Sequence, residues 1–156
     1  MAQKHKNIQQ TTETENAFED RILNLRRVSK KTTGGNKISF SALVLVGDKM
    51  GTVGIGSAKA SDVSSAIKKA AVQARKASVK IKRKGDTIAH EIRNKYKSTK
   101  VLIKPAPKGS GVIAGGALRD VVELAGIRDV SGKLIGSTNK ATVAICAIEA
   151  LSKVKE

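Results

Sequence analysis

The chain has 156 residues, enough for one domain or for two small domains that share a core, and its formal net charge is +17. Its single cysteine excludes an intramolecular disulfide, and no apolar run is long enough for a membrane-spanning helix. Residues 21–110 hold 22 of the 30 Lys and Arg and four of the 13 Asp and Glu, whereas residues 111–156 are almost neutral. So concentrated a positive charge predicts a polyanionic partner, and nucleic acid is the commonest polyanion in a cell.

Residues 1–20 are polar, have a net charge of −2 and are predicted to form a disordered N-terminal arm. They lack the apolar core of a signal peptide, so we expect a cytosolic protein. Binding to a membrane surface would require a helix with large apolar residues beside a basic side. The only strong basic helix in the sequence presents mostly alanine, so no membrane partner is expected.

The N-terminal unit, residues 21–83, has the pattern of three strands and a helix. Residues 22–28 are ambiguous between helix and strand, and residues 29–37 are predicted to form a basic loop with a Gly-Gly turn. Residues 38–46 alternate apolar side chains with others, which predicts a strand. A tight glycine-containing reversal pairs this strand with residues 52–57 as a hairpin.

A helix is predicted from Ser61 or Asp62 to about Val79, with small apolar residues on the side that faces the sheet and lysines on the other. Gly54 and Gly56 lie two residues apart and therefore share one face of the preceding strand. Glycines at such positions remove side chains, which predicts that another element packs closely there.

Residues 84–156 are predicted to form a second unit with the order β-β-α-β-α, which makes the whole chain an α+β protein. Its first two strands, residues 86–93 and 100–104, flank a basic loop over 93–100. The remaining predicted elements are a glycine-rich segment at 104–119 whose helix continues to about 126, a strand at 130–135 and a helix at 139–154.

Few residues could carry catalysis. His5 falls in the arm, and His90 is predicted in a strand beside Glu91, where neighbours point to opposite faces and do not converge. Cys146 lies among apolar residues of the last helix and is interpreted as a core side chain. Two histidines and one cysteine do not make a usual zinc site. We therefore expect no enzyme, no metal, no cofactor and no small-molecule substrate.

The segment from Lys104 to Arg119 combines both prolines of the chain with four glycines, between a predicted strand and helix. Such a segment either holds phosphate or allows close packing. Its Pro-x-x-x-Gly-x-Gly pattern is similar to the loop of galactokinase-type kinases, but the Gly-Lys-Ser/Thr ending of a P-loop is missing. Because the charge after Gly111 is almost neutral, we favour packing and contact with a partner, with Lys104 and Lys108 reaching RNA at its edge.

The aromatic content decides how RNA would be bound. Two Phe, one Tyr and no Trp argue against platforms that stack single-stranded bases. Lysine and arginine side chains on loops and on one helix face are instead expected to contact the phosphates of folded RNA.

Several motifs in order resemble bacterial small-subunit ribosomal protein five, over about residues 21–152. They are Phe40-Ser41-Ala42-Leu43-Val44-Leu45-Val46-Gly47-Asp48, Val53-Gly54-Ile55-Gly56, Gly109-Ser110-Gly111-Val112-Ile113-Ala114-Gly115-Gly116, Leu124-Ala125-Gly126-Ile127 and Gly136-Ser137-Thr138-Asn139. The resemblance implies a double-stranded-RNA-binding-like domain followed by a C-terminal domain that shares its topology with galactokinase-type kinases, without their catalysis.

The resemblance also implies a structural role in the small ribosomal subunit of the cytoplasmic ribosome. The expected partners are small-subunit (16S) rRNA, ribosomal proteins four and eight, and mRNA near the channel through which it enters. The expected roles are subunit assembly and decoding accuracy. The first alternative is a free-standing basic RNA chaperone. A less favoured alternative is a protein that retains a phosphate-transferring activity.

Two sets of site residues follow. The resemblance identifies residues 26–37 with the family's RNA-inserting hairpin loop and the surroundings of Gly109 with the side that faces protein four. The predicted RNA-binding residues are Arg26, Arg27, Ser29, Lys30, Lys31, Gly34, Gly35, Lys37, Lys68, Lys69, Lys95, Lys97 and Lys100. The predicted protein contacts are Lys108, Gly109, Ser110 and Gly111. This chain departs from the family in Lys108, where an acidic residue is usual, and in Ala89 and Lys140, where proline is usual.

Overall fold

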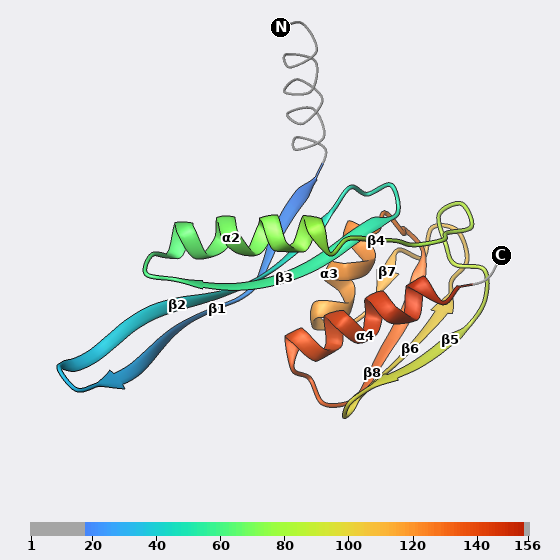
Figure 1. The fold of residues 1–156 in the computed structure, drawn as a ribbon. Helices are drawn as coiled ribbons and strands as arrows, with labels where there is room; N and C mark the ends of the chain where they lie inside the picture. Colours follow the sequence, from blue (N-terminus) through green and yellow to red (C-terminus); the bar gives the residue numbers. More distant parts are fainter. Residues whose placement is uncertain (1–17, 155–156) are drawn as a thin grey trace, which may run out of the picture.

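The structure is a computed structural model that describes residues 18–154, so most of the predicted N-terminal arm lies outside the described residues. Its N-terminal half is an antiparallel sheet of order β1-β2-β3-β4 with one helix packed on it (Figure 1). The elements are β1 (Glu19–Thr32), β2 (Gly35–Gly47), β3 (Thr52–Ala60), α2 (Val63–Lys76) and β4 (Val79–Lys80). The predicted pattern of three strands and a helix is present, with a fourth short strand after the helix.

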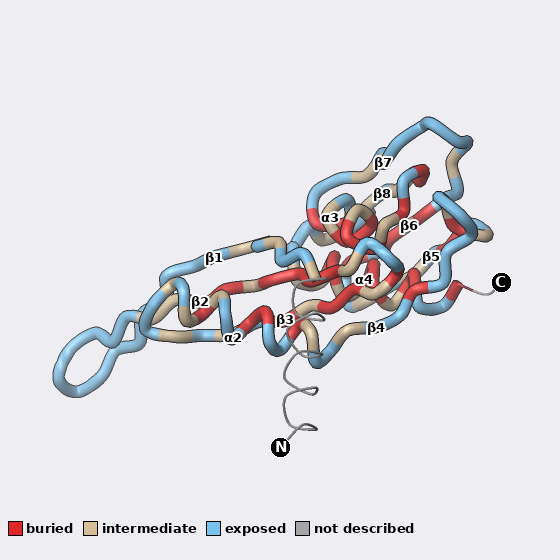
Figure 2. The backbone as a smooth tube through the Cα atoms, turned by 90° about the horizontal axis from the view of Figure 1, so that it is seen from above, coloured by how far each residue is buried: buried red, intermediate tan, exposed pale blue. Residues whose placement is uncertain are grey.

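The prediction of a basic loop over residues 29–37 is wrong. β1 and β2 remain paired as far as Thr32 and Gly35, and only Thr33 and Gly34 form the turn. This part of the hairpin extends beyond the sheet and the helix into solvent (Figure 2). Since neither of its faces is buried, its sequence lacks the apolar alternation by which a strand is recognised. The ambiguous residues 22–28 belong to the same strand.

The close packing predicted at Gly54 and Gly56 is confirmed. A Cβ atom at Gly54 would lie 2.1 Å from the carbonyl oxygen of Ala74, and one at Gly56 would lie 2.2 Å from that of Ala70. The glycines and the alanines of α2 therefore let the helix backbone approach the sheet. The helix ends at Lys76, earlier than predicted, because the chain turns there to pair β4 with β3.

The C-terminal half is a second four-stranded sheet, of order β5-β6-β8-β7, with two helices on one face (Figure 1). Its elements are β5 (Ile92–Tyr96), β6 (Thr99–Pro105), β7 (Val112–Ile113), α3 (Gly116–Leu124), β8 (Val130–Gly136) and α4 (Lys140–Ser152). β7 is parallel to β8, and α3 connects them. The predicted α+β class and the order of the two units are confirmed.

Three details of the second unit differ from prediction. The strand predicted at 86–93 begins only at Ile92, and the predicted loop 93–100 consists mostly of β5 and β6, with a turn at Lys97 and Ser98. Exposed lysines and one arginine alternate along this hairpin, which conceals its strand pattern. His90 is not in a strand but in an exposed bend before β5. β7 has only two residues and was not predicted.

One hydrophobic core joins the two halves. Leu23, Leu45, Val53 and Ile81 of the N-terminal half belong to the same buried cluster as α3, α4 and the second sheet. Cys146 lies in this cluster without solvent exposure, as predicted, and burial raises the pKa of its thiol. The hairpin is thus attached to a body formed by both halves.

Candidate nucleic-acid interface

The exposed hairpin carries cations on both of its faces. In the β1–β2 ladder Lys30 lies opposite Lys37, and Arg26 shares their face because side chains two apart on a strand point the same way. Arg27 and Lys31 point to the other face. All five are exposed, and no carboxylate among the described residues lies within ion-pair distance of them. A ribbon with unpaired cations on two faces can contact phosphates on both sides of a groove.

The tip of the hairpin is closed by a two-residue turn. Gly34 and Gly35 lie at its end, where the Thr32 hydroxyl donates a 2.7 Å hydrogen bond to the carbonyl of Gly35. Gly35 has a φ of +133°, which favours glycine. A Cβ atom at either glycine would meet nothing within 4 Å, so the tip has open space around it. Ser29, the remaining predicted contact on this hairpin, is exposed on the face of Arg27 and Lys31.

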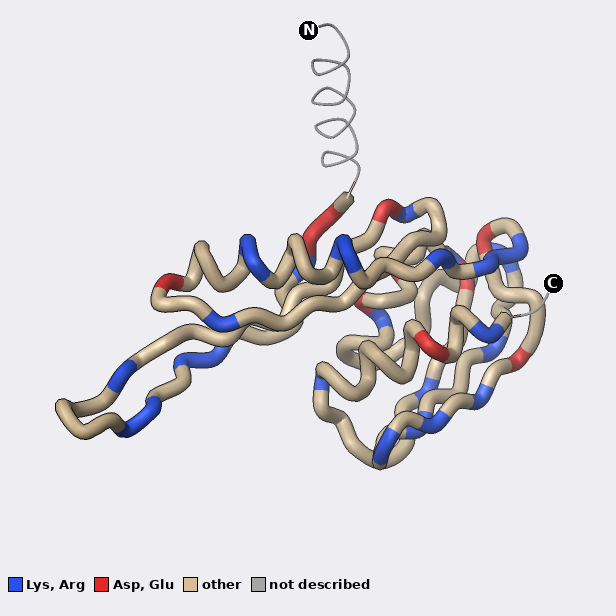
Figure 3. The backbone as a smooth tube through the Cα atoms, in the orientation of Figure 1, with Lys and Arg blue, Asp and Glu red and all other residues tan. Residues whose placement is uncertain are grey.

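The other predicted RNA contacts lie elsewhere. Lys68 and Lys69 are exposed on α2, on the side away from the sheet. Lys95 and Lys100 form a directly opposed pair of β5 and β6, and Lys97 occupies the turn between these strands, with its ammonium 5.5 Å from the centre of the Tyr96 ring. The hairpin, α2 and the β5–β6 turn are three separate basic regions, not one patch (Figure 3).

A β-bulge at Leu23 fixes the base of the hairpin. The β1–β2 register shifts between Ile22 and Asn24, so Leu23 is the extra residue. Its side chain enters the shared core, and its carbonyl accepts a 2.8 Å hydrogen bond from the ammonium of Lys140 at the start of α4. Neither contact has a local sequence signal, because the partners are far apart in the chain.

Ion pairs add to this joint. The Arg21 guanidinium donates to Asp120 at 2.9 Å and to Glu123 at 2.7 Å, which links β1 to α3. Hydrogen bonds from Arg119 and then Arg21 lower the pKa of Glu123 below its ordinary value. The hydrogen bonds that Arg21 donates to Glu123 and then to Asp120 raise the pKa of its guanidinium. Both shifts keep Arg21 and Glu123 charged at neutral pH.

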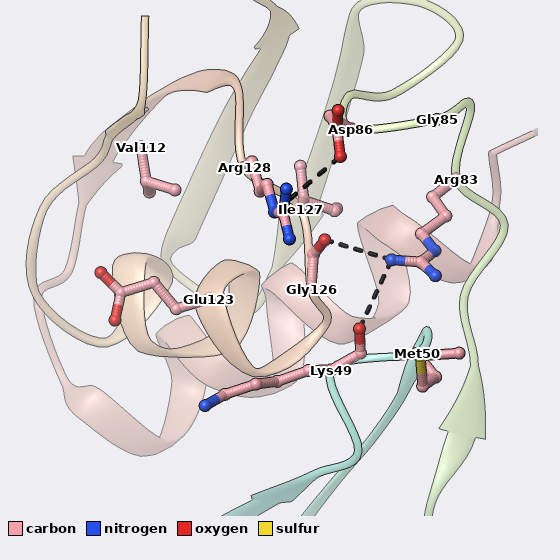
Figure 4. Close-up of a pocket in the computed structure, with 10 residues that line it drawn as sticks. All are labelled: Lys49, Met50, Arg83, Gly85, Asp86, Val112, Glu123, Gly126, Ile127 and Arg128. Carbon is pink, nitrogen blue, oxygen red and sulfur yellow. Dashed lines mark hydrogen bonds and ion pairs between the residues drawn. The ribbon is translucent and has the colours of Figure 1, made fainter. Parts of the chain in front are cut away.

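A hollow of about 860 Å³ lies between the two halves, beside the connection that joins them (Figure 4). The guanidinium of Arg83 crosses it and donates to the carbonyls of Lys49, at 3.4 Å, and Gly126, at 3.2 Å. On its far side Arg128 faces Asp86 at 3.9 Å. Figure 4 shows Arg83 and Arg128 engaged with groups of the hollow, while Glu123 and the ammonium of Lys49 pair with residues outside it. The hollow is a joint between the halves and presents no converging acid, base and nucleophile.

The glycine-rich loop contains an anion-binding arrangement that the protein fills itself. The backbone N–H groups of Gly109 and Gly111 donate to the same carboxylate oxygen of Asp129, at 3.0 and 2.9 Å. Both glycines have positive φ, at +88° and +72°, as in a backbone nest for anions. β7 separates the loop from the start of α3, so loop and helix do not combine into a phosphate cradle. The phosphate interpretation of this segment is therefore not supported.

Asp129 was not among the predicted site residues. It is almost fully buried, and it holds a loop whose outer residues Lys108 to Gly111 are exposed. The Ser110 hydroxyl donates to the carbonyl of Pro107 at 2.7 Å, which closes the turn. The role of Asp129 could not be found from the sequence, because Asp129 lies 18 residues after Gly111 in the chain. The four predicted partner contacts do lie together at the surface.

Among the described residues, no group of three His, Cys, Asp or Glu could hold a metal ion. None of the helices from α2 to α4 is long and apolar enough to cross a membrane.

Comparison with known proteins identifies the family. The family model described as "Ribosomal protein S5, N-terminal domain" matches residues 18–82, and "Ribosomal protein S5, C-terminal domain" matches residues 94–156. The chain belongs to the ribosomal protein S5 family. Small ribosomal subunit protein uS5 of Campylobacter jejuni subsp. jejuni, from strain 81-176 and from strain ATCC 700819 / NCTC 11168, is 48% identical over 138 residues. The matches cover 88% of this chain and 94% of each relative.

Membership of the S5 family confirms the resemblance found in the sequence. The family is structural and not enzymatic, and it places the chain in the small subunit of the cytoplasmic ribosome. The S5 family therefore accounts for the large positive charge without requiring a catalytic site.

Proposed function

We propose that the chain binds folded small-subunit rRNA chiefly through the β1–β2 hairpin, which enters an RNA groove and contacts phosphates with both faces. The observation that carries this proposal is the exposed ribbon with Arg26, Lys30 and Lys37 on one face and Arg27 and Lys31 on the other. Because phosphate contacts position a protein without stacking bases, the lack of aromatic residues at the tip fits this mode.

Two further regions would extend the RNA contact. Lys68 and Lys69 on the outer side of α2 form one, and Lys97 in the β5–β6 turn, with Lys95 and Lys100 beside it, forms the other. The glycine-rich loop, with Lys108, Gly109, Ser110 and Gly111 at its surface, would contact ribosomal protein four.

In the subunit, these surfaces would support assembly, decoding accuracy and the channel through which mRNA enters, with ribosomal protein eight as a further neighbour. These finer roles rest on the family. The joint at Leu23 and Lys140 supports them physically, because it connects the RNA-facing hairpin rigidly to the domain that carries the protein-facing loop.

Sedimentation of the chain tests this function. In a lysate at low salt, the chain is expected to sediment with small ribosomal subunits, and sedimentation as a free protein would refute the proposal. Equal affinity for unrelated RNA duplexes and for small-subunit rRNA would favour the alternative, a free-standing RNA chaperone. A chemical footprint on small-subunit rRNA would identify the nucleotides contacted by the hairpin.

A further inference from the structure

The second sheet has a face that no described element covers. α3 and α4 pack on one side, and the side chains that point the other way from β5, β6 and β8 are exposed or half-buried. We call this surface the open sheet face and define it by Arg93, Lys95, Lys100, Leu102, Lys133 and Ile135. Within it Arg93, Leu102 and Lys133 form one row across the strands, and Lys95, Lys100 and Ile135 form the next.

Its centre is aliphatic. Leu102 and Ile135 are diagonal neighbours on β6 and β8, and both line a hollow of about 380 Å³. The side chain of Ile135 is half exposed. An isolated exposed aliphatic residue is ordinary, but two side by side in a hollow offer a place for an apolar side chain of a partner.

Its border is cationic. Arg93, Lys95 and Lys100 line the same hollow, and Lys133 lies directly opposite Leu102. Glu91 lies 2.9 Å from Arg93, but no carboxylate of residues 18–154 lies within ion-pair distance of Lys95, Lys100 or Lys133. A partner on this face would therefore be expected to bring negative charge around an apolar group.

RNA does not fit this combination. The open sheet face carries no aromatic ring for stacking, since Tyr96, the only aromatic residue of the sheet, alternates with Lys95 and so points towards the helices. Burial of Leu102 and Ile135 against a phosphate backbone would remove water from phosphates without giving them hydrogen bonds. Lys95 and Lys100 form the border between this face and the β5–β6 turn, where the RNA contact is proposed.

We propose that the open sheet face is a docking surface for a protein segment that inserts an aliphatic side chain between Leu102 and Ile135 and surrounds it with carboxylates. The aliphatic contact supplies affinity, while the carboxylates select the segment by pairing with Lys133, which lies further from the β5–β6 turn than Lys100 does. This surface is additional to the RNA-binding hairpin and to the glycine-rich loop.

Photocrosslinking in assembled subunits tests the proposal. The full chain with Ile135→p-benzoylphenylalanine is incorporated into small subunits, which are purified and irradiated. The expected product is destroyed by protease and not by ribonuclease, and its partner peptide contains an aliphatic residue with at least two Asp or Glu nearby. A cross-link to rRNA, a partner peptide without carboxylates, or no cross-link would each overturn the proposal.

Two further variants sharpen the test. In the cross-linking chain, Lys133→Glu should reduce the yield about tenfold by placing a negative charge against the partner's carboxylates, whereas Lys133→Arg should retain it. An equal yield from both variants would refute the proposed charge pairing. A second chain with Lys31→p-benzoylphenylalanine reports on the hairpin. If that chain fails to cross-link rRNA while the chain with Ile135→p-benzoylphenylalanine cross-links an acidic protein segment, the proposed RNA site fails and the docking surface stands.

Discussion

The ammonium of Lys140 donates a 2.8 Å hydrogen bond to the backbone carbonyl of Leu23, 117 residues earlier in the chain. Leu23 is the bulged residue of β1, and Lys140 is the first residue of α4. The bond therefore joins the base of the hairpin to a helix of the other half. A proline here, the residue expected from the resemblance, has no ammonium and could not donate this bond, so Lys140 has a structural role in this chain.

Replacement of Lys140 by Met tests this role. The aliphatic part of the side chain is preserved, but the Leu23 carbonyl loses its charged donor in a partly buried place. We expect the free energy of unfolding to fall by about 1–2 kcal/mol in urea titrations. Lys69→Met, which removes an exposed ammonium from α2, should change it by less than about 0.5 kcal/mol. Equal effects of the two variants would show that the bond contributes nothing specific.

Elements with one buried face could be predicted from the sequence. The part of β2 predicted over residues 38–46 buries its apolar side, and so does α3 with the stripe Leu118, Val121 and Val122. Periodicity therefore reveals both elements. The two basic hairpins lack this signal because most of their side chains face solvent, and each was predicted as a loop. A strand that is specified by pairing and turn geometry, and not by burial, is hidden from pattern analysis.

The candidate site shows the same division. The cations of the hairpin were chosen as candidates from composition, and the resemblance correctly placed them on a hairpin. Asp129 and Leu23 could not be chosen in this way. The carboxylate of Asp129 fills a backbone nest, and the bulged Leu23 enters the core of the other half. Both roles depend on contacts between segments that are distant in the chain. Such long-range contacts leave no periodic trace in a single sequence.

Alanine at Gly54 is expected to separate α2 from the sheet. The new Cβ atom would lie 2.1 Å from the carbonyl oxygen of Ala74, a backbone atom that cannot move without the helix. Overpacking of this kind costs about 1–3 kcal/mol, so the melting temperature should fall by several degrees. Gly34→Ala is the matched control, since a Cβ atom there meets nothing within 4 Å. A melting temperature that is unchanged by Gly54→Ala would contradict the close packing.

Removal of three hairpin cations should flatten the salt dependence of RNA binding. Lys30, Lys31 and Lys37 are replaced by alanine, and affinity for small-subunit rRNA is measured across a range of salt concentrations. If each lysine neutralises one phosphate, the slope of log affinity against log salt should become shallower by about 2.7.

The control removes the same charge elsewhere. Alanine at Lys76, Lys80 and Lys84, which are exposed and outside the predicted set, should leave most of the slope in place. An unchanged slope for the hairpin variant, or equal slopes for the two variants, would show that the contacts lie elsewhere.

The loop that presents Lys108 to Gly111 should depend on Asp129. Asp129→Ala leaves the N–H groups of Gly109 and Gly111 without their acceptor, so their amide hydrogens should exchange with solvent markedly faster in NMR measurements. Stability should fall by about 1–3 kcal/mol. Asp129→Asn retains one acceptor oxygen and should slow the exchange again. Unaltered exchange in the alanine variant would mean that the carboxylate does not hold the loop.

The pairing of Glu123 with Arg119 and Arg21 predicts a specific response to acid. Because these hydrogen bonds lower its pKa in the folded state, the unfolded chain binds a proton first as the pH falls. The stabilisation is therefore complete above the ordinary glutamate pKa, about 4.3, and is lost as the pH falls through the lower folded value. A double-mutant cycle with Glu123→Gln and Arg21→Met should give a coupling of about 1 kcal/mol at pH 7 that disappears towards pH 2–3. A coupling of constant size over this range would contradict an ionised Glu123 as its source.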